Sequence, residues 1–264
     1  MATTCPTGFN VDQLRERIRG MYDRLARAPG GDFHFHRGLE YAVARLGYNR
    51  AELERLPPGS TSRFAGVGNP LRVGPVHPGE TVLDHACGAG MDLLLAAQRV
   101  GPTGRAIGVD MTPAMRAEAA AGAAAAGLEK VVEVRAGLFE DLPLPLESVD
   151  LVISNGVVNL APDKLRVFRE IARVLRPGGR LYLADVVVER ELKLAVREDP
   201  ELWAACIGGA LPESELAALA AEAGLRGGRV VERFDCFAGT STKTKVAADL
   251  RVHSVTFFAQ KPYR

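Results

Sequence analysis

Residues 82–90 read Val-Leu-Asp-His-Ala-Cys-Gly-Ala-Gly, an apolar run that meets an acid and then two glycines. This pattern predicts a buried strand that ends at Asp84 and turns through glycine into a helix. A second acid, Asp110, ends the next strand-like run, residues 106–110. A glycine turn lets a ligand approach the backbone closely, and an acid at the second strand tip can hold both hydroxyls of a ribose. Together these features indicate a nucleoside-binding site.

From about residue 78 onward, apolar runs suited to strands alternate with helical patterns. Strands are predicted at residues 81–85, 105–110, 131–135, 149–154, 180–186, 229–234 and 252–260. Helices are predicted at residues 91–100, 113–126, 163–175, 194–207 and 213–223. The third strand is followed by a loop, Glu140–Pro145, and the polar tract Thr240–Lys245 is predicted to be a surface loop. This order predicts an α/β fold, a doubly wound, mostly parallel, seven-stranded sheet whose last strand is antiparallel.

The first 70 residues carry helical patterns and no strand pattern. Helices are predicted at residues 11–28, 39–46 and 50–56. Pro57–Ser60 is predicted to be a break, and Gly66–Pro70 a loop. We therefore divide the chain into an N-terminal helical segment, residues 1–70, and a cofactor-binding domain, residues 71–264. The N-terminal segment is expected to fold over the cofactor cleft as a lid.

The composition is that of an ordinary globular protein. The 264 residues are 47% hydrophobic and 25% charged, with a formal net charge of +1, so charge supports neither a nucleic-acid partner nor a membrane partner. No apolar run is long enough for a transmembrane helix, which favours a cytoplasmic location. The four cysteines show no metal-ligand spacing, so we predict free thiols and no metal site. A monomer or homodimer acting on a small molecule is expected.

The identity of the nucleoside follows from the charges around the glycine turn. A dinucleotide fold needs a small residue at the third position of its glycine fingerprint, and this chain has Leu93 there. A pyrophosphate at this helix start would also face Asp84 and Asp92, which repel it. S-adenosylmethionine presents an ammonium and a sulfonium, which those carboxylates attract. The residues therefore favour S-adenosylmethionine over a nicotinamide dinucleotide, with a purely structural glycine turn as a third interpretation.

Several further motifs agree with this choice. They are Gly79–Asp84, Cys87–Asp92, Gly108–Pro113, Ile153–Leu160, Pro162–Lys164, Arg173–Arg180 and Trp203–Leu211. In this order they resemble the class I S-adenosylmethionine-dependent methyltransferases, which have a Rossmann-like fold, and specifically the arsenite methyltransferase family and its close relatives. The resemblance spans about residues 64–225.

The resemblance implies a cofactor-binding set at the strand ends. Its members are Asp84, Ala86, Gly88, Gly90, Asp110, Met111, Leu138, Phe139 and Asn155. The first four would cradle the methionine end of the cofactor, and Asp110 would bind the ribose. Met111 and the loop at residues 137–139 would contact the adenine, and Asn155 would lie under the sulfonium.

The chain departs from the family where the acceptor is expected to bind. Family members that methylate arsenic hold it with cysteine thiolates, because a soft centre prefers soft ligands. Val67 and Gly156 occupy two positions where such relatives usually have cysteine, and Cys206 remains. One thiolate does not make a three-coordinate site, and whether Cys236 approaches Cys206 is open. The acceptor is therefore left open between a metalloid or thiol compound and an oxygen or carbon nucleophile.

The candidates for catalysis are Asn155, Cys206, His34 and His36. The two histidines point the same way only in an extended segment. They are expected to form a polar patch, to contact the substrate or to act as a base, whereas a metal site would need further ligands that the sequence does not mark. Methyl transfer from a sulfonium is an in-line displacement, so positioning supplies much of the rate and a general base is not required. Two alternatives are a cofactor-binding protein without catalysis and a nicotinamide-dependent oxidoreductase.

Overall fold

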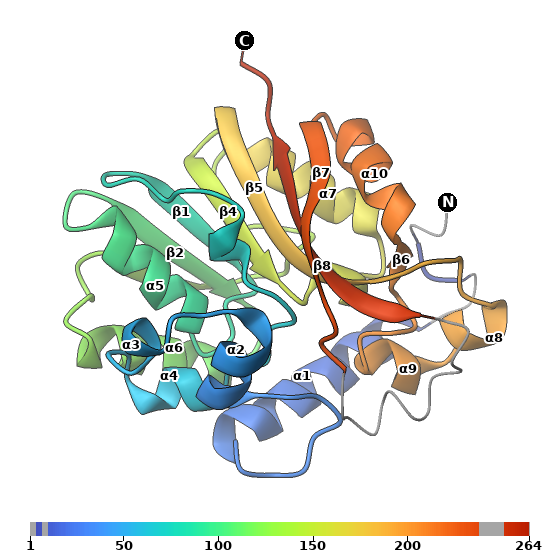
Figure 1. The fold of residues 1–264 in the computed structure, drawn as a ribbon, viewed down its shortest axis with the longest axis horizontal. Coiled ribbons are helices and arrows are strands. Elements are labelled where there is room, and N and C mark those ends of the chain that lie inside the picture. The colour runs from blue at the N-terminus through green and yellow to red at the C-terminus, as the bar shows by residue number, and fades with distance from the viewer. Residues whose placement is uncertain (1–3, 7–9, 238–250, 264) are drawn as a thin grey trace.

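A twisted sheet forms the centre of the protein in a computed structural model that describes residues 4–6, 10–237 and 251–263. Its strands are β1 (Thr81–His85), β2 (Arg105–Asp110), β3 (Val132–Ala136), β4 (Val149–Asn155), β5 (Leu175–Val188), β7 (Arg226–Phe234) and β8 (Val252–Gln260). The strand order is β3-β2-β1-β4-β5-β8-β7, with the two-residue β6 (Leu211–Pro212) beside β5 (Figure 1). The first five strands are parallel, and β8 is antiparallel to β5 and β7. The predicted doubly wound, mostly parallel sheet is confirmed.

Helices cover both faces of the sheet. The face that includes Val82 packs against α5 (Met91–Val100) and α6 (Pro113–Ala125). The face that includes Leu83 packs against α7 (Lys164–Val174) and α10 (Leu216–Glu222). Adjacent residues of β1 thus enter opposite cores, because successive side chains of a strand alternate between faces. Burial on both faces explains the nearly continuous apolar runs from which these strands were predicted.

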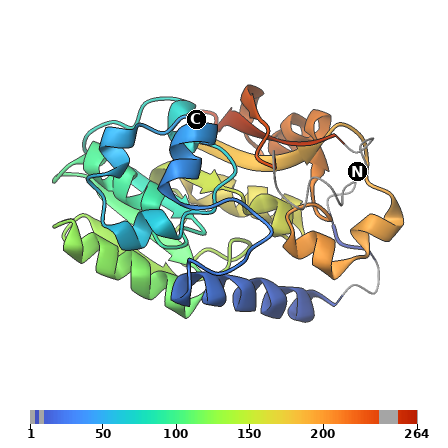
Figure 2. The ribbon, with the colours of Figure 1, turned by 60° about the horizontal axis from the view of Figure 1, so that its bottom comes forward.

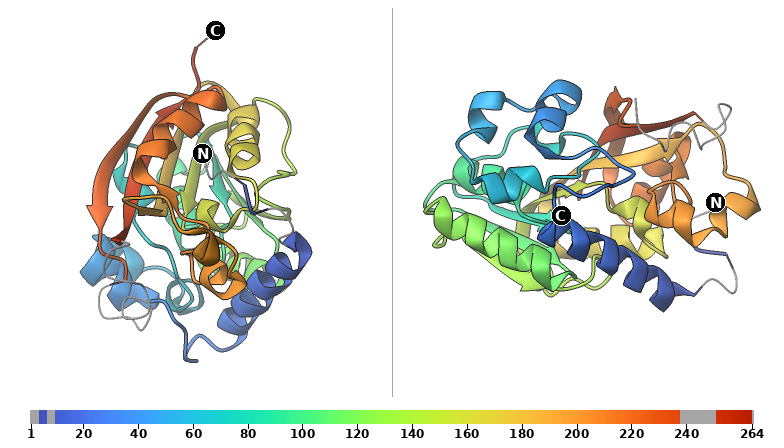
Figure 3. Two further views of the ribbon diagram at one scale, coloured as in Figure 1. Left: turned by 90° about the vertical axis from the view of Figure 1, so that its right-hand side faces the viewer. Right: turned by 90° about the horizontal axis from the view of Figure 1, so that it is seen from below.

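The N-terminal helices contact both the sheet core and the carboxyl ends of the strands. They are α1 (Val11–Arg27), α2 (Gly38–Leu46), α3 (Arg50–Leu53), α4 (Pro58–Ser62) and the 3₁₀ turn η1 (Pro70–Arg72). Helices α2 and α3 share an apolar core with β1 and α5. Helix α1 contacts α6 (Figure 2) and α9 (Pro200–Ala204) (Figure 3). It therefore connects a helix that follows β2 with one that follows β5.

Several predicted boundaries are wrong, and proline explains two of them. The helix predicted over residues 194–207 is two short helices, α8 (Leu194–Arg197) and α9, because Pro200 begins a new helix with Asp199 as its cap. The break predicted at Pro57–Ser60 is the start of α4, with Pro58 in its first turn. The turns η2 (Val158–Leu160) and η3 (Glu213–Glu215) complete the list of elements. The tract Thr240–Lys245, predicted to be a surface loop, lies outside the described residues. Among the residues that the structure describes, no helix is both long and apolar enough to cross a membrane.

Candidate functional site

One cavity lies at the carboxyl ends of β1, β2 and β4 and collects most of the predicted cofactor-binding residues. Its lining includes Asp84, Ala86, Gly88, Gly90, Asp110, Met111, Phe139 and Asn155. Leu138 does not line it, although its neighbours Gly137 and Phe139 do. Ile18 and Tyr22 of α1 and the segment from Arg63 to Gly66 close the cavity on the side of the N-terminal helices.

The glycine turn between β1 and α5 has an unusual backbone. Ala86, Gly88 and Gly90 have φ angles of 61°, 52° and 87°, all in the left-handed region. This region costs a residue with a Cβ on the order of 1 kcal/mol, so Ala86 is held there against its own preference. A Cβ on Gly90 would also lie 3.1 Å from the Cβ of Ala119 on α6. The turn thus requires glycine at Gly90 both for its backbone angle and for close packing.

Asp110 joins the glycine turn to the end of β2. Its Oδ2 accepts a hydrogen bond from the backbone N–H of Gly88 at 3.0 Å, and its Oδ1 accepts one from Thr112 at 2.7 Å. Each carboxylate oxygen has a second lone pair, so the group can still accept two hydroxyl hydrogens from a ligand. This geometry fits the predicted role of Asp110 toward a ribose.

Asp84 has a buried carboxylate oxygen that no described residue satisfies. The residue is 3% exposed and its Oδ2 accepts no hydrogen bond from the described part of the chain. Burial raises the pKa of Asp84 well above its usual value, and the nearby carboxylates of Asp92 and Asp110 raise it further. A cation bound in the cavity beside this oxygen would reverse both effects.

The side chain of Asn155, at the end of β4, is fully engaged by the protein. Its Oδ1 accepts hydrogen bonds from the N–H groups of Val67 at 2.8 Å and Gly68 at 3.2 Å. Its Nδ2 donates to Asp92 Oδ2 and to the carbonyl oxygen of Gly68, both at 2.9 Å. The Tyr48 hydroxyl donates to Asp92 Oδ1 at 2.7 Å, and the pKa of Asp92 is about 6 because burial outweighs these hydrogen bonds. Asn155 therefore connects β4, α5 and the loop at residues 66–69.

The positive charge among the lining residues is already paired. It belongs to Arg63, whose Nε donates to the carbonyl oxygen of Ala26 at 2.6 Å and whose Nη1 donates to that of Gly59 at 3.0 Å. Its Nη2 lies 3.1 Å from a carboxylate oxygen of Glu118. Three carboxylates and one paired guanidinium make the cavity suited to a cationic ligand, and unsuited to a pyrophosphate.

Three of the four candidates for catalysis lie outside this lining. Cys206 is buried in an apolar cluster with Val67 and Cys236, and its φ is 63°. Burial raises the pKa of the Cys206 thiol, and Asp185 and Cys236 raise it further. His34 lines a separate hollow between α1 and α9, and His36 stacks on Tyr41 with ring centroids 5.1 Å apart. In the described ranges, no group of three or more His, Cys, Asp or Glu side chains is arranged so that it could hold a metal ion.

No role was predicted for His85 from the sequence, although this residue lies within the stretch at residues 82–90. The side chain is fully buried, and its ring nitrogens lie 3.0 Å from the carbonyl oxygen of Phe139 and 3.2 Å from the Ser154 hydroxyl. Because a carbonyl can only accept, Nε2 carries the hydrogen and Nδ1 accepts from Ser154. Burial lowers the pKa of His85 to about 4, so the ring is neutral. A second polar residue directly after Asp84, at the end of a buried strand, was the available signal.

Comparison with known proteins identifies similar chains. Residues 76–224 match the family model described as a methyltransferase domain. The arsenite methyltransferase of Halobacterium salinarum is 47% identical over 180 residues, which are 68% of this chain and 46% of that protein. The arsenite methyltransferase of Aquipseudomonas alcaligenes is 37% identical over 212 residues, 78% of this chain and 60% of the relative. The chain thus spans about half the length of these curated relatives.

Solved structures give the same result. The crystal structure of an arsenic(III) S-adenosylmethionine methyltransferase from Chlamydomonas reinhardtii superposes with a TM-score of 0.73 and 36% identity, covering 81% of this chain and 73% of that one. The [4+2]-cyclase SpnF shares the fold along 99% of this chain and 100% of its own, with a TM-score of 0.65 and 18% identity.

Proposed function

The chain belongs to the class I S-adenosylmethionine-dependent methyltransferases, in the family of the arsenite methyltransferases, and from this premise we propose that it transfers a methyl group from S-adenosylmethionine to a small-molecule acceptor. The observation that carries the proposal is the unsatisfied, buried oxygen of Asp84 in the cavity. A buried carboxylate without a partner is costly, and the ammonium of the methionine moiety supplies the missing charge and hydrogen.

The remaining lining fits the rest of the cofactor. Asp110 offers two free lone pairs to the ribose hydroxyls, and Met111 and Phe139 offer apolar surfaces to the adenine. The bound cofactor supplies an electrophilic methyl group on a positively charged sulfur. The chain's own residues bind and orient it, so that the acceptor meets the methyl group in line.

Asn155 supports this site indirectly in our proposal. Both ends of its amide are used by Val67, Gly68 and Asp92, so it contributes position and not a free hydrogen bond. The acceptor side of the cavity is then formed by Ile18, Tyr22 and other mainly apolar residues. We propose that α1 and the segment at residues 60–66 act as a lid that excludes water from the reaction.

A soft acceptor is the second candidate. Val67, Cys206 and Cys236 belong to one apolar cluster, and a Cβ on Gly156 would lie 3.4 Å from a methyl carbon of Val67. Of the two positions that lack cysteine, Val67 therefore shares an apolar cluster with the two thiols, and Gly156 lies next to Val67. Two thiols suit a soft acceptor that already carries another ligand better than one that needs three.

The proposed function is tested by calorimetry with S-adenosylhomocysteine and with NADH. Binding of S-adenosylhomocysteine without binding of NADH is expected, and the reverse pattern would show that the nucleoside is wrong. Incubation with methyl-labelled S-adenosylmethionine and a metabolite extract then separates an enzyme from a cofactor-binding protein, because a protein without catalysis labels no product.

The soft-acceptor candidate predicts a specific loss in Cys206→Ser. Turnover of trivalent arsenic or antimony compounds should fall by at least about a hundredfold, because a hydroxyl is a poor ligand for a soft centre. Binding of S-adenosylhomocysteine should stay within about twofold, because Cys206 does not line the cavity. Cys5→Ser, at a partly buried thiol beside the carbonyl oxygen of Pro162, is the control. Retained turnover in Cys206→Ser would remove this candidate.

A further inference from the structure

We propose that Glu170 and Arg173 of α7 are positioning residues for cofactor binding, which act by fixing the helix-free segment at residues 137–148 and so hold Phe139 against the adenine. The proposal rests on the proposed function, because it takes the cavity ligand to be an adenosyl compound. It adds two residues that do not line the cavity themselves.

The segment at residues 137–148 has to cross the sheet without a helix. It leaves β3 at one edge and enters β4, which lies beyond β2 and β1 in the strand order. Doubly wound folds usually make such a crossover with a helix, whose backbone groups bond to one another. Here the backbone groups need other partners, because unpaired polar groups that are buried are costly.

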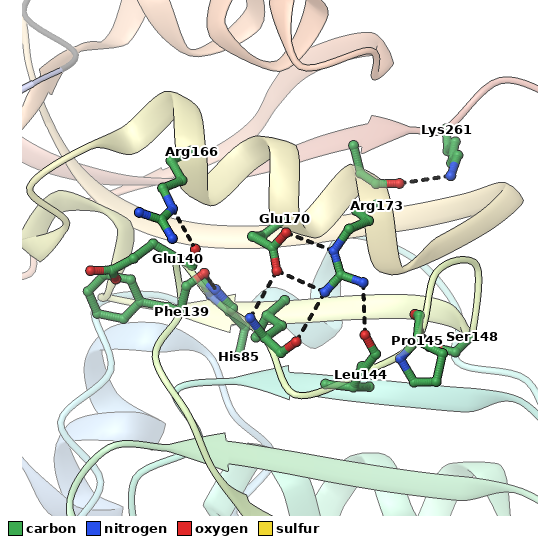
Figure 4. A network of polar contacts seen from close by, with 12 residues as sticks. His85, Phe139, Glu140, Leu144, Pro145, Ser148, Arg166, Glu170, Arg173 and Lys261 are labelled. Carbon is green, nitrogen blue, oxygen red and sulfur yellow. Dashed lines mark hydrogen bonds and ion pairs between the residues drawn. The ribbon is translucent and has the colours of Figure 1, made fainter.

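Helix α7 supplies several of these partners (Figure 4). Glu170 Oε2 accepts a hydrogen bond from the N–H of Leu142 at 2.9 Å. Arg173 donates from Nη2 to the carbonyl oxygen of Leu142 at 3.0 Å and from Nη1 to that of Leu144 at 2.8 Å. The two side chains also pair with each other at 2.7 Å. A single ion pair thus holds the middle of the crossover at three backbone atoms.

The end of the crossover nearest the cavity is held by two further side chains. Arg166 Nε donates to the carbonyl oxygen of Glu140 at 3.0 Å, and His85 donates to that of Phe139 (Figure 4). The rings of His85 and Phe139 also lie against each other, with centroids 5.9 Å apart. Phe139 therefore has little freedom while the segment behind it is fixed. Glu170 does not line the cavity, and its hydrogen bond to Leu142 links it to the segment that includes Phe139.

A double-mutant cycle tests this route. The affinity for S-adenosylhomocysteine is measured by calorimetry in the unaltered chain, Glu170→Gln, Phe139→Ala and the double variant. We expect each single change to weaken binding roughly three- to tenfold, which is the range of an aromatic contact. The double variant should bind no more weakly than Phe139→Ala, because Glu170 then has no aromatic contact left to position.

Asp150→Asn is the matched control. Asp150 also accepts from a backbone N–H, that of Thr81 at 2.8 Å, and from an arginine, Arg176, at 2.6 Å. Asp150 is on β4 beside the amino end of β1, whereas the cavity lies at the carboxyl ends of these strands. Loss of its charge should therefore lower the unfolding temperature and leave the affinity within about twofold. Should Glu170→Gln fail to fold, Arg173→Lys provides the same cycle, because lysine keeps the charge but loses the two-pronged contact.

The outcomes distinguish failure of the positioning role from failure of the proposed methyltransferase function. No binding of S-adenosylhomocysteine to the unaltered chain would refute the proposed function and the inference with it. Binding that weakens by the same factor for Glu170→Gln with and without Phe139 would refute only the positioning role, as would an unchanged affinity in Glu170→Gln. Loss of the Glu170 effect in the Phe139→Ala background supports it.

Discussion

At the scale of single residues, Asp84 has the carboxyl group of the cavity that most lacks a partner. The two neighbouring carboxylates accept hydrogen bonds from the protein. Asp92 accepts from the side chains of Tyr48 and Asn155, and Asp110 accepts from backbone N–H groups. Asp84 alone among the three keeps an oxygen that the described residues leave unsatisfied. A ligand ammonium therefore has one clear place to bind, and its arrival changes the protonation of that group.

The first prediction concerns the pH dependence of cofactor binding. The pKa of Asp84 is raised in the free cavity, and an ammonium favours the ionised form, so binding should release a proton. The affinity for S-adenosylhomocysteine should therefore be highest above the raised pKa of Asp84, and fall as the pH is lowered through that pKa. Calorimetry in buffers of different ionisation enthalpy measures the released proton directly.

Asp84→Asn is the control for this prediction. It should weaken binding by about ten- to a hundredfold, because a charged hydrogen bond is lost. Asp92, with a pKa of about 6, also takes up a proton as the pH is lowered, so the comparison between the two proteins isolates Asp84. An unchanged pH profile in Asp84→Asn would contradict the assignment of the ammonium to this residue.

The sequence was sufficient to bring Asp84, the glycines and Asp110 together, because both acids end apolar runs and parallel strands share one carboxyl edge. The sequence was not sufficient to predict the hydrogen-bond partners of the Asn155 side chain. The partners that engage its amide include Tyr48, which is 107 residues away, and a loop 87 or 88 residues away. Such pairings depend on how the N-terminal helices dock, and no local pattern in the chain records this.

At the scale of elements, the loop at residues 66–69 is fixed by side chains and not by secondary structure. Asn155 binds its backbone on one side, and the Ser254 hydroxyl donates to the carbonyl oxygen of Val67 at 2.6 Å on the other. A Cβ on Gly68 would lie 2.9 Å from the Cβ of Ala184 on β5. The loop is thus clamped between β4, β5 and β8.

The second prediction concerns Asp92, the carboxylate that binds the amide of Asn155, and uses the variant Tyr48→Phe. Removing the hydroxyl takes a buried donor from the Asp92 carboxylate, which should lower the free energy of unfolding by about 1–3 kcal/mol. Tyr182→Phe removes a hydroxyl that donates to a neutral carbonyl oxygen, that of Pro75 at 3.1 Å, and should cost about 1 kcal/mol or less. Urea denaturation of both variants provides the comparison. Equal losses would mean that Asp92 gains nothing from Tyr48.

The bounds of several strands and of the helices that join the first strands were predictable. β1, β2, β8 and α5 have the predicted bounds, and α6 and α7 differ from theirs by at most one residue at each end, whereas β5 begins five residues earlier than predicted. The helix predicted over residues 194–207 failed because its apolar spacing continues through Pro200, whose ring prevents Asp199 from being helical. The loop predicted at Glu140–Pro145 lies within the crossover at residues 137–148, whose fixed shape comes from α7, which follows it in the sequence.

At the scale of the whole molecule, α1 is attached to the rim of the cavity from both sides. Arg15 pairs with Glu140, whose side chain is 4% exposed and belongs to the same segment as Phe139. Arg17 pairs with Glu201 on α9, where the side chains are 39% and 78% exposed. Helices α2 and α3 share their apolar core with β1, so side chains from both sides of the predicted boundary between residues 70 and 71 pack together. The division into two parts at this boundary stays a prediction.

The third prediction is that the Arg15–Glu140 pair holds the proposed lid closed. Arg15→Met keeps the apolar stem and removes the charge, so α1 should detach more often and S-adenosylhomocysteine should dissociate roughly tenfold faster. Stopped-flow displacement measures the release rate. Arg17→Met, one half-turn away on the same helix, should leave the rate within about twofold, because an exposed ion pair contributes little.

Breaking a buried pair also leaves a carboxylate unpaired, which by itself destabilises the fold by several kcal/mol. Adding Glu140→Gln to Arg15→Met removes that charge, so the unfolding temperature should recover in part. Release of S-adenosylhomocysteine should stay fast in this double variant, because the attachment of α1 to the segment that includes Phe139 is still absent. A release rate that recovers together with stability would mean that Arg15 contributes to folding alone, and that α1 is not a gate for the cofactor.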